Sequence, residues 1–248
     1  VDVDFLEADQ ALKMDQLDQL LDPMATRIKT DLEVDFGDFM LENSGLSIGD
    51  PDTAVTTWQQ VADAGALMAS VGIPDDADWN YIVNPFTEAK LADVQRSLGA
   101  NGALVGSALA KATVTENFAG LRVMRGTTLP TYTTAAGADR AGTLSGTPTA
   151  TYVSVKDTMV QTLAVTAFQA NLDVKKGQIV EVTGRNMVNL STRQPFLDST
   201  GSQVLWRAVV TADVTLNGSG AGNLVVTGPA VFETGGQYNT VDSALTSG

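Results

Sequence analysis

Hydrophobic residues recur every three or four positions before Tyr132 and at alternate positions in most of the chain after it. The first spacing is typical of amphipathic helices and the second of half-buried strands. With 248 residues, the chain is long enough for one large domain or two smaller ones, each with its own core. The pattern therefore predicts an α+β protein in which a helical part precedes a β-rich part.

The first predicted helix starts at Asp22, which suits an N-cap, and Pro23, which suits the first helical position. Gly45 follows the periodic residues and predicts the end of the helix. Acidic residues occupy the face opposite the apolar stripe. This stripe consists of Ile28, Leu32, Phe36 and either Phe39 or Met40.

A second helix is predicted between Asp52, a possible N-cap, and the stop residue Gly72. Its apolar face combines Trp58, either Val61 or Ala62, and Met68. Tryptophans on apolar stripes or strands are expected in a core rather than at a ligand site. This expectation applies to Trp58, Trp79 and Trp206.

The stretch WNYIVN, residues 79–84, is short, apolar and rich in aromatic and β-branched residues, so it predicts a buried strand. Asn84 then suits the N-cap of a helix and Pro85 its first position. The predicted buried positions of this helix are Leu91, Val94 and Leu98, and the predicted stops are Gly99 and Gly102. A further strand is predicted in GLRVMRGTTLP, which Pro130 closes.

Residues 133–150 are rich in Thr, Ala and Gly and nearly devoid of large apolar groups, so they predict a long mobile loop. Beyond them, at least four short strands alternate with close turns, one at Gly177 and a hairpin in LNGSGAGN. This arrangement predicts a small antiparallel barrel or sandwich. Residues 236–248 return to a helix-like pattern, so the β part is predicted to be inserted between two pieces of an α/β domain.

The composition removes several classes of chemistry. The chain has no Cys and no His, which excludes disulfides, thiolate catalysis, His-containing triads and His- or Cys-based zinc motifs. Residues 1–52 hold 14 acidic and 3 basic residues, a balance of −11 within a net charge of −14. Such a segment is not expected to grip phosphates, and a solvated helical face is favoured over an acidic binding tail.

Three stretches contain residue types that could bind a ligand or take part in catalysis, but a structural role explains each of them better. NGSGAGN is rich in glycine but lacks the Gly-Lys-Ser/Thr ending of a phosphate loop, and it falls between predicted strands. DVDFLEAD offers carboxylates for calcium, but its spacing matches no EF-hand loop. Asp75 and Asp76 follow Pro74 and are expected to be turn and cap residues rather than an acid–base pair. We therefore expect no catalytic residue, no metal site and no cofactor.

The order of these units resembles the core of tailed-phage major capsid proteins. The resemblance rests on ADAGALMASVGIP, then DWNYIVNPFTEAKLADVQRSLG, then about twenty variable residues and FAGLRVMRGTTLP. Upstream, LDPMATRIKTDLEVDFGDFMLENSG is similar to the long spine helix of that family, and NSG to its closing turn. A β insertion directly after TTLP resembles the podophage coat-protein branch, with its telokin-like insertion domain. VKKGQIVEVTG and QYNTVDSALTSG resemble the entry and exit of that insertion.

The resemblance implies a capsid-protein fold with a spine-helix region at 1–52, an apical α/β domain at 53–132 and an inserted β-barrel domain at 133–236. Residues 237–248 would return to the apical domain. By comparison with the family, the chain is expected to be truncated at both ends. Asp139 and Arg140 are the only charged residues of the loop at 133–150, and the family suggests salt bridges there across local two-folds.

The implied function is that of a structural, non-enzymatic subunit of an icosahedral bacteriophage capsid around double-stranded DNA. Its partners would be copies of itself in pentamers and hexamers, with scaffolding and portal proteins. Sequence-specific nucleic-acid binding is not expected. Membrane association is not expected either, because the sequence has no run of 18 or more apolar residues. Localisation would be the virion, after assembly in the cytoplasm of the bacterial host.

Two other classes remain open at this point. A bacterial surface or adhesin-type β module fits the Thr- and Gly-rich strands, but it predicts a secretion signal and a repeated β unit, and neither appears in the sequence. An enzyme would have to use Asp, Glu, Ser, Thr or Lys alone, and no spaced constellation of these residues is present.

Overall fold

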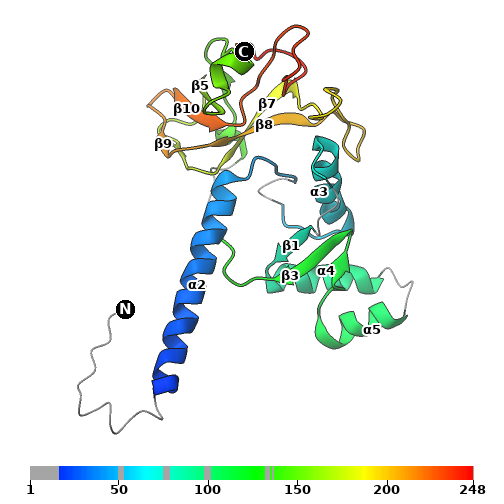
Figure 1. Cartoon of the computed structure of the whole chain (residues 1–248). Helices are drawn as coiled ribbons and strands as arrows, with labels where there is room; N and C mark the ends of the chain where they lie inside the picture. The colour runs from blue at the N-terminus through cyan, green and yellow to red at the C-terminus, as the bar shows by residue number, and fades with distance from the viewer. Residues whose placement is uncertain are drawn as a thin grey trace, which may run out of the picture.

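The structure is a computed structural model, and it describes residues 17–49, 53–74, 79–97, 102–131, 135 and 137–247 (Figure 1). A long helix stands beside a small three-stranded sheet with its helices, and a larger β unit lies across the ends of both (Figure 1). Helices and sheets both contribute substantially, so the predicted α+β class is confirmed.

The long helix, α2 (Leu17–Asn43), starts earlier than the sequence pattern predicts. The predicted start at Asp22 and Pro23 is wrong, because Pro23 lies inside the helix. The Leu and Gln residues just before it are strong helix formers, and they extend the helix toward the N-terminus despite the donor that proline lacks. At the other end the helix stops two residues before Gly45, where the Asn43 side chain donates a hydrogen bond to Phe39 O at 2.7 Å.

The three-stranded sheet has the order β1–β3–β2, with β1 and β3 parallel and β2 and β3 antiparallel. Three helices accompany it, and the first two contribute apolar side chains to one core with the sheet. The elements are α3 (Trp58–Val71), β1 (Asn80–Val83), α4 (Pro85–Ser97), α5 (Gly102–Lys111), β2 (Asn117–Phe118) and β3 (Leu121–Arg125). The buried residues of this core are Val61, Leu91, Ala92, Val114, Phe118 and Leu121, with Met68, Trp79, Tyr81 and Val123 packed against them.

Several predicted details of this part are confirmed. Asn84 caps α4, since its Oδ1 accepts a hydrogen bond from Thr87 N–H at 2.7 Å, and Pro85 is the first helical residue. Gly72 ends α3 in the left-handed region, with φ of 106°. Leu91 is fully buried.

Other details need correction. The cap of α3 is Thr57, which forms a reciprocal capping box with Gln60, while the predicted cap Asp52 lies outside the described residues. Trp58 is 42% exposed, because it starts the helix, where the chain has not yet reached the core. Gly102 begins α5 instead of ending α4. Leu98 and Gly99 lie outside the described residues, and Val94 is only half-buried.

The predicted burial of the strand at 79–84 holds for only one of its faces. Val83 is 2% exposed and Trp79 packs against the core, whereas Ile82 is 41% exposed. Ile82 and Met124 are register partners in the parallel pair β1–β3, and Met124 is 50% exposed. Side chains alternate across a strand, so this pair faces away from the core that α3 and α4 cover.

The larger β unit is a five-stranded antiparallel sheet in the order β4–β5–β10–β8–β7, with a separate two-stranded pair β6–β9. Its core surrounds Trp206, which is 1% exposed as predicted, together with Leu163, Leu216 and Leu224. The strands are β4 (Thr143–Leu144), β5 (Val160–Thr166), β6 (Asp173–Val174), β7 (Ile179–Asn186), β8 (Leu205–Val210), β9 (Val214–Thr215) and β10 (Gly222–Thr227). Two short helical elements precede β5: the 3-10 helix η2 (Gly137–Arg140) and α6 (Tyr152–Val155).

Two segments on the flanks of this sheet differ in secondary structure from what the sequence pattern predicts. The helix-like pattern at 237–248 forms no helix in its described part, and Val241 and Leu245, each 1% exposed, complete the core of the five-stranded sheet. The predicted mobile loop at 133–150 contains η2 and β4, and Ala150 at its end is 5% exposed and bridges to Val231. Small side chains bury little surface each, but they allow the backbone to pack closely against a sheet that supplies the hydrogen bonds.

The contrast between buried Leu91 and exposed Ile82 gives a stability prediction for the three-stranded part. Leu91→Ala is expected to destabilise the protein by about 2–5 kcal/mol, because it removes buried methyl groups and leaves a cavity. Ile82→Ala is the matched control and is expected to cost less than about 1 kcal/mol, because much of its side chain is already in water. Urea unfolding midpoints would measure both, and equal losses would contradict this placement of the core.

Candidate functional site

Asp139 and Arg140, the predicted contact residues, lie together in η2, on the segment that leads into the edge strand β4 of the five-stranded sheet. Both residues are half-buried. The Asp139 carbonyl accepts a long hydrogen bond from Gln169 N–H, at 3.5 Å, and Arg140 also interacts with other groups of the chain. The structure therefore places the two charged residues at one edge of the β unit, where a backbone hydrogen bond connects their segment to the residues after β5.

The C-terminal half of this loop is fastened to β5. Thr143 and Leu144 pair with Thr166 and Val165, and Ser145 N–H donates to a β5 carbonyl at 2.8 Å. This strand pairing holds residues 143–145 in place although the side chains around them are small.

Phe168 forms a second anchor at the base of the loop. A Cβ placed on Gly142 would overlap the Phe168 ring, and one on Gly220 would overlap the Phe168 backbone. Phe168 N–H donates to Gly220 O at 3.2 Å, and Gly220 has a φ of 67°. Because the two glycines have no side chains, the loop and the β9–β10 connection can both pack closely against Phe168. Sequence reasoning missed this role, because glycine in a Thr-rich stretch was taken as a sign of mobility.

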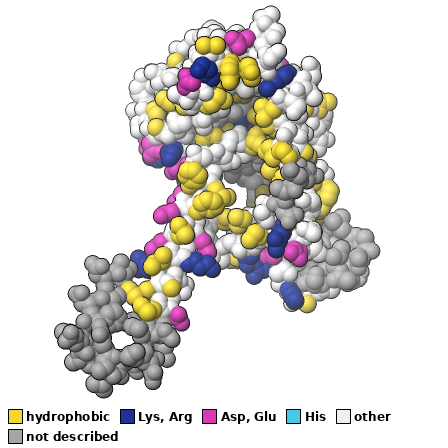
Figure 2. Space-filling model, viewed as in Figure 1, with side chains coloured by type: hydrophobic (Ala, Val, Ile, Leu, Met, Phe, Trp, Pro, Cys, Tyr) yellow, Lys and Arg dark blue, Asp and Glu magenta, His cyan; other side chains and the backbone are white. Residues whose placement is uncertain are grey.

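A second surface runs along α2, where the apolar stripe is uncovered in the described part of the chain. The exposed fractions are 66% for Ile28, 68% for Leu32, 60% for Phe36, 61% for Phe39 and 45% for Met40. Figure 2 shows groups of hydrophobic side chains along the helix, separated by charged and other side chains. Contiguous exposed apolar surface on this scale marks a site of contact with other protein.

Charged pairs flank this stripe and keep the helix itself stable. Arg27 Nε lies 3.7 Å from an Asp31 oxygen, and Lys29 Nζ lies 3.8 Å from a Glu33 oxygen, both at i,i+4 spacing. Such exposed pairs contribute about 0.3–0.5 kcal/mol each to a helix. At one point the helix is closely approached: a Cβ on Gly37 would lie 3.2 Å from Pro130 Cδ. Glycine has a low helix propensity, but at position 37 its lack of a side chain permits the contact with the segment after β3.

The ionisable groups with shifted pKa values shape turns or lie in the core. The Thr200 hydroxyl and the Ser202 N–H hold the pKa of Asp198 below its ordinary value. The backbone N–H of Lys176, followed by the Lys175 ammonium, does the same for the pKa of Asp213. Burial raises the pKa of Tyr81. Carboxylates held ionised by turn hydrogen bonds act as acceptors and are poor proton donors at neutral pH.

Two ion pairs have one partially or fully buried partner each. Glu88 on α4, 5% exposed, accepts a hydrogen bond of 2.6 Å from Arg125 Nε on β3. Arg207 Nε on β8 lies 2.5 Å from a Glu181 oxygen on β7, although the angle does not make a hydrogen bond. Each pair joins two neighbouring elements, which is a structural role.

The stretches considered for chemistry give no site among the described residues. In NGSGAGN, Asn217 Oδ1 accepts the N–H groups of Ser219 and Ala221 at 2.9 and 3.0 Å, so the stretch forms a turn. The predicted hairpin is wrong, because the strands on either side of the turn belong to different sheets: β9 pairs with β6, and β10 pairs with β5 and β8. DVDFLEAD and the pair Asp75–Asp76 lie outside the described residues. Within the part of the chain that the structure covers, no group of three or more His, Cys, Asp or Glu residues could hold a metal ion. None of the helices described there is long and apolar enough to cross a membrane.

Comparison with known proteins connects this fold to phage coat proteins. Residues 2–243 match the family model described as P22 coat protein, gene protein 5. The chain is also 30% identical over 251 residues to the major capsid protein of Acyrthosiphon pisum secondary endosymbiont phage 1. That alignment covers 100% of this chain and 59% of the relative, so the chain spans about three-fifths of the length of that protein.

The glycine at position 142 gives a prediction for the loop. Gly142→Ala is expected to destabilise the protein by about 1–3 kcal/mol, because the new methyl group displaces the Phe168 ring. Gly218→Ala in the β9–β10 connection is the matched control, since open space surrounds that position, and it is expected to be neutral. Thermal melting would compare them. A neutral Gly142→Ala would mean that Phe168 does not anchor the loop.

Proposed function

Because this chain belongs to the P22 coat protein family, we propose that it is a structural subunit of an icosahedral bacteriophage capsid. In this role it self-assembles into the shell that encloses a double-stranded DNA genome, and it resides in the virion. The observation that carries the proposal is the family match over residues 2–243, which spans the helical part and the β unit together. An adhesin-type β module would account for the β unit alone, so the capsid function is favoured.

The physical character of the chain supports a structural role. Its two sheets are built around separate buried cores, and its ion pairs join elements of the fold. Apolar side chains are exposed along α2, as a subunit with many protein neighbours requires. A shell subunit needs stiff elements and repeated contacts, and it needs no reactive group.

The division into domains is part of the same proposal. The spine-helix region would comprise residues 1–52, the apical domain residues 53–132, and the five-stranded sheet an inserted telokin-like barrel domain. The sequence pattern ends this insertion at 236, but the packing of Val241 and Leu245 in the core of that sheet supports an end beyond Leu245. Residues 237–248 would then belong mainly to the inserted domain.

Assembly would involve pentamers and hexamers of the subunit, with scaffolding and portal proteins as partners and the bacterial host cytoplasm as the place of assembly. Asp139 and Arg140 are proposed as contacts between capsomers. Their position at the edge of the β unit, next to edge strand β4, supports this role, because an edge is where a neighbouring subunit can approach. Their shared anchoring would present both charges in a fixed geometry.

Electron microscopy of the product of the complete gene, expressed with its neighbouring genes, tests the function itself. Closed, uniform shells are expected, because a coat subunit carries the self-complementary surfaces that close a shell. A population of monodisperse monomers under the same conditions would argue against a coat protein.

A second test concerns the proposed contact. Asp139→Ala and Arg140→Ala are expected to shift the products from closed shells to tubes, aberrant particles or free subunits. The melting temperature of the unassembled subunit should stay within a few degrees of the parent value, because partly exposed ion pairs contribute only about 0–1 kcal/mol within a subunit. Lys156→Ala, an exposed charge on the same β unit, serves as a control. Normal shells from both loop variants would remove the contact role and leave the coat assignment intact.

A further inference from the structure

The C-terminal end of α3 leaves four backbone carbonyls without partners inside the helix, as every α-helix does. Two of them are closed locally by the N–H groups of Gly72 and Ile73, at 3.0 and 3.1 Å. The other two belong to Ser70 and Val71. No donor within the helix can reach them, so their hydrogen bonds have to come from elsewhere in the fold.

The donors come from the β unit. Asn189 Nδ2 donates to Ser70 O at 2.6 Å, and Leu190 N–H donates to Val71 O at 3.1 Å. The β unit therefore completes the end of a helix that belongs to the three-stranded part, across 119 residues of sequence. The left-handed Gly72 permits this approach, since side chains of the β unit lie 3.8 Å from the position of a Cβ there.

Asn189 is held in place by its own loop. Its Oδ1 accepts the N–H groups of Ser191 and Thr192, at 2.8 and 2.9 Å, while its backbone N–H donates to Gln194 O at 3.0 Å. Arg193 N–H closes the turn on Asn189 O at 2.9 Å. The Oδ1 atom of Asn189 thus orients the amide group within the loop, and the Nδ2 atom donates to α3. Neither an apolar nor an acidic side chain could make both interactions.

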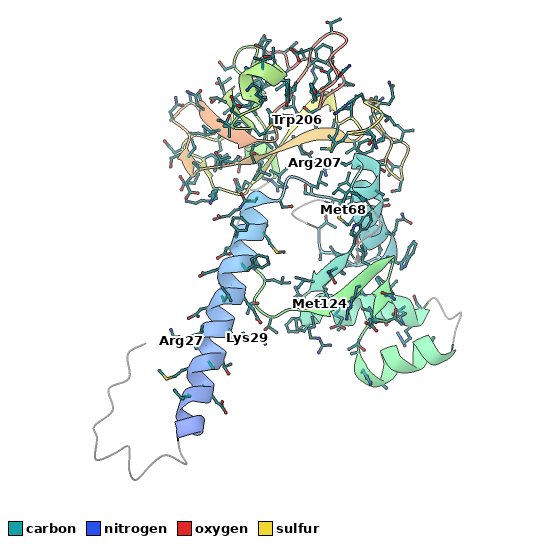
Figure 3. The ribbon with its side chains drawn as sticks, in the orientation of Figure 1. Arg27, Lys29, Met68, Met124, Trp206 and Arg207 are labelled. Atoms are coloured by element: carbon teal, nitrogen blue, oxygen red, sulfur yellow. The ribbon has the colours of Figure 1, made fainter. Side chains whose placement is uncertain are left out.

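An apolar cluster lies beside these hydrogen bonds, where α3 meets the β unit. Leu67 and Val71 of α3 are each 8% exposed, and Met187 of the β unit is 9% exposed. Figure 3 labels Met68, which lies one turn before the end of α3, close below the β unit. The partly buried residues packed on the cluster are Leu46, Phe196 and Val204.

Two polar contacts flank this cluster. Ser199 of the β unit donates from its hydroxyl to Asp63 of α3 at 3.0 Å. Lys176, in the turn before β7, lies 2.5 Å from Glu42 in the last turn of α2, and its backbone N–H is held by Asp213 at 2.8 Å. The β unit is therefore fastened both to α3 and to the end of the long helix.

From these contacts we propose that residues 187–199 form a joint that locks the β unit at a fixed angle to the three-stranded sheet, with Asn189 as its positioning residue. The hydrogen bonds of the joint are directional, so they specify one orientation: a rotated β unit would move both donors away from the Ser70 and Val71 carbonyls. Apolar contacts alone would tolerate such a rotation, because they have no direction.

The consequence for a shell rests on the proposed function. If the subunit carries its β unit at a fixed angle before assembly, the angle between neighbouring subunits is set partly within each chain. Contacts with neighbours then select among preformed surfaces and need not order the β unit first. Loosening the joint would widen the range of curvatures that the subunits adopt.

The joint is tested on unassembled subunits of the complete protein, so the result does not depend on shell formation. The 248-residue chain has no cysteine, which allows clean spin labelling at Phe86→Cys and Val153→Cys, two positions that are 90% and 72% exposed. Double electron–electron resonance then measures the distribution of distances between the two spin labels, one on α4 and one on α6 of the β unit. A single narrow distribution is expected for the parent protein, and a broad one would overturn the proposal.

Asn189→Asp is the informative variant, because it keeps the acceptor oxygen for the loop and removes the donor to Ser70 O. It is expected to broaden the distribution and to accelerate amide exchange at Leu190 about fivefold to tenfold. Asn217→Asp is the matched control, since Asn217 also orders a turn through its Oδ1 but lies in the β9–β10 connection. An unchanged distribution and exchange rate in Asn189→Asp would overturn the proposal.

Charge reversal at the second fastening point provides a test if Asn189→Asp fails to fold. Glu42→Lys and Lys176→Glu are each expected to broaden the distance distribution, and the double exchange is expected to narrow it again. Equally broad distributions in the parent, both single variants and the double variant would overturn the fixed angle. A failed capsid function would leave these results unaffected, and would appear only in the electron microscopy of shells.

Discussion

The burial of apolar side chains between β5, β8 and β10 is the interaction on which the larger part of this structure depends. Residues from all three strands are fully buried around Trp206, and the chain end adds Val241 and Leu245 to the same core. With no cysteine in the sequence, no disulfide supports this sheet. Its shape then determines where the joint with α3 forms, where the edge strand β4 binds and where Asp139 and Arg140 are presented.

Within the described residues, a long apolar surface stays uncovered on α2. A helix in water cannot rely on such a stripe for stability, so exposed ion pairs along its length and a contact at Gly37 support it. For a subunit that meets many neighbours this arrangement is physically reasonable, because contact surfaces must stay open until assembly. The fold thus separates two tasks, since the sheets provide rigidity and the exposed helix provides surface.

Rigidity has a specific origin where the two sheets meet. Apolar clusters give affinity between parts of a protein, and directed hydrogen bonds to the last carbonyls of α3 select one angle. This is the kind of control that a shell subunit needs, since small angular errors are multiplied by every copy. It also gives the loop at 189–194 a defined shape, since Asn189 binds both its neighbours in the loop and the end of α3.

The sequence by itself determined the local elements and the family resemblance. Asn84 and Pro85 start a helix, Gly72 ends one and the runs around Trp206 form strands, because capping, proline geometry and side-chain alternation act over a few neighbouring residues. Only the tertiary structure decided the rest. It extended α2 to the N-terminal side of Pro23, exposed Ile82, paired residues 143–144 with β5 and brought Val241 and Leu245 into the β core. It also brought Asn189 to α3, because long-range contacts depend on shapes that no local pattern contains.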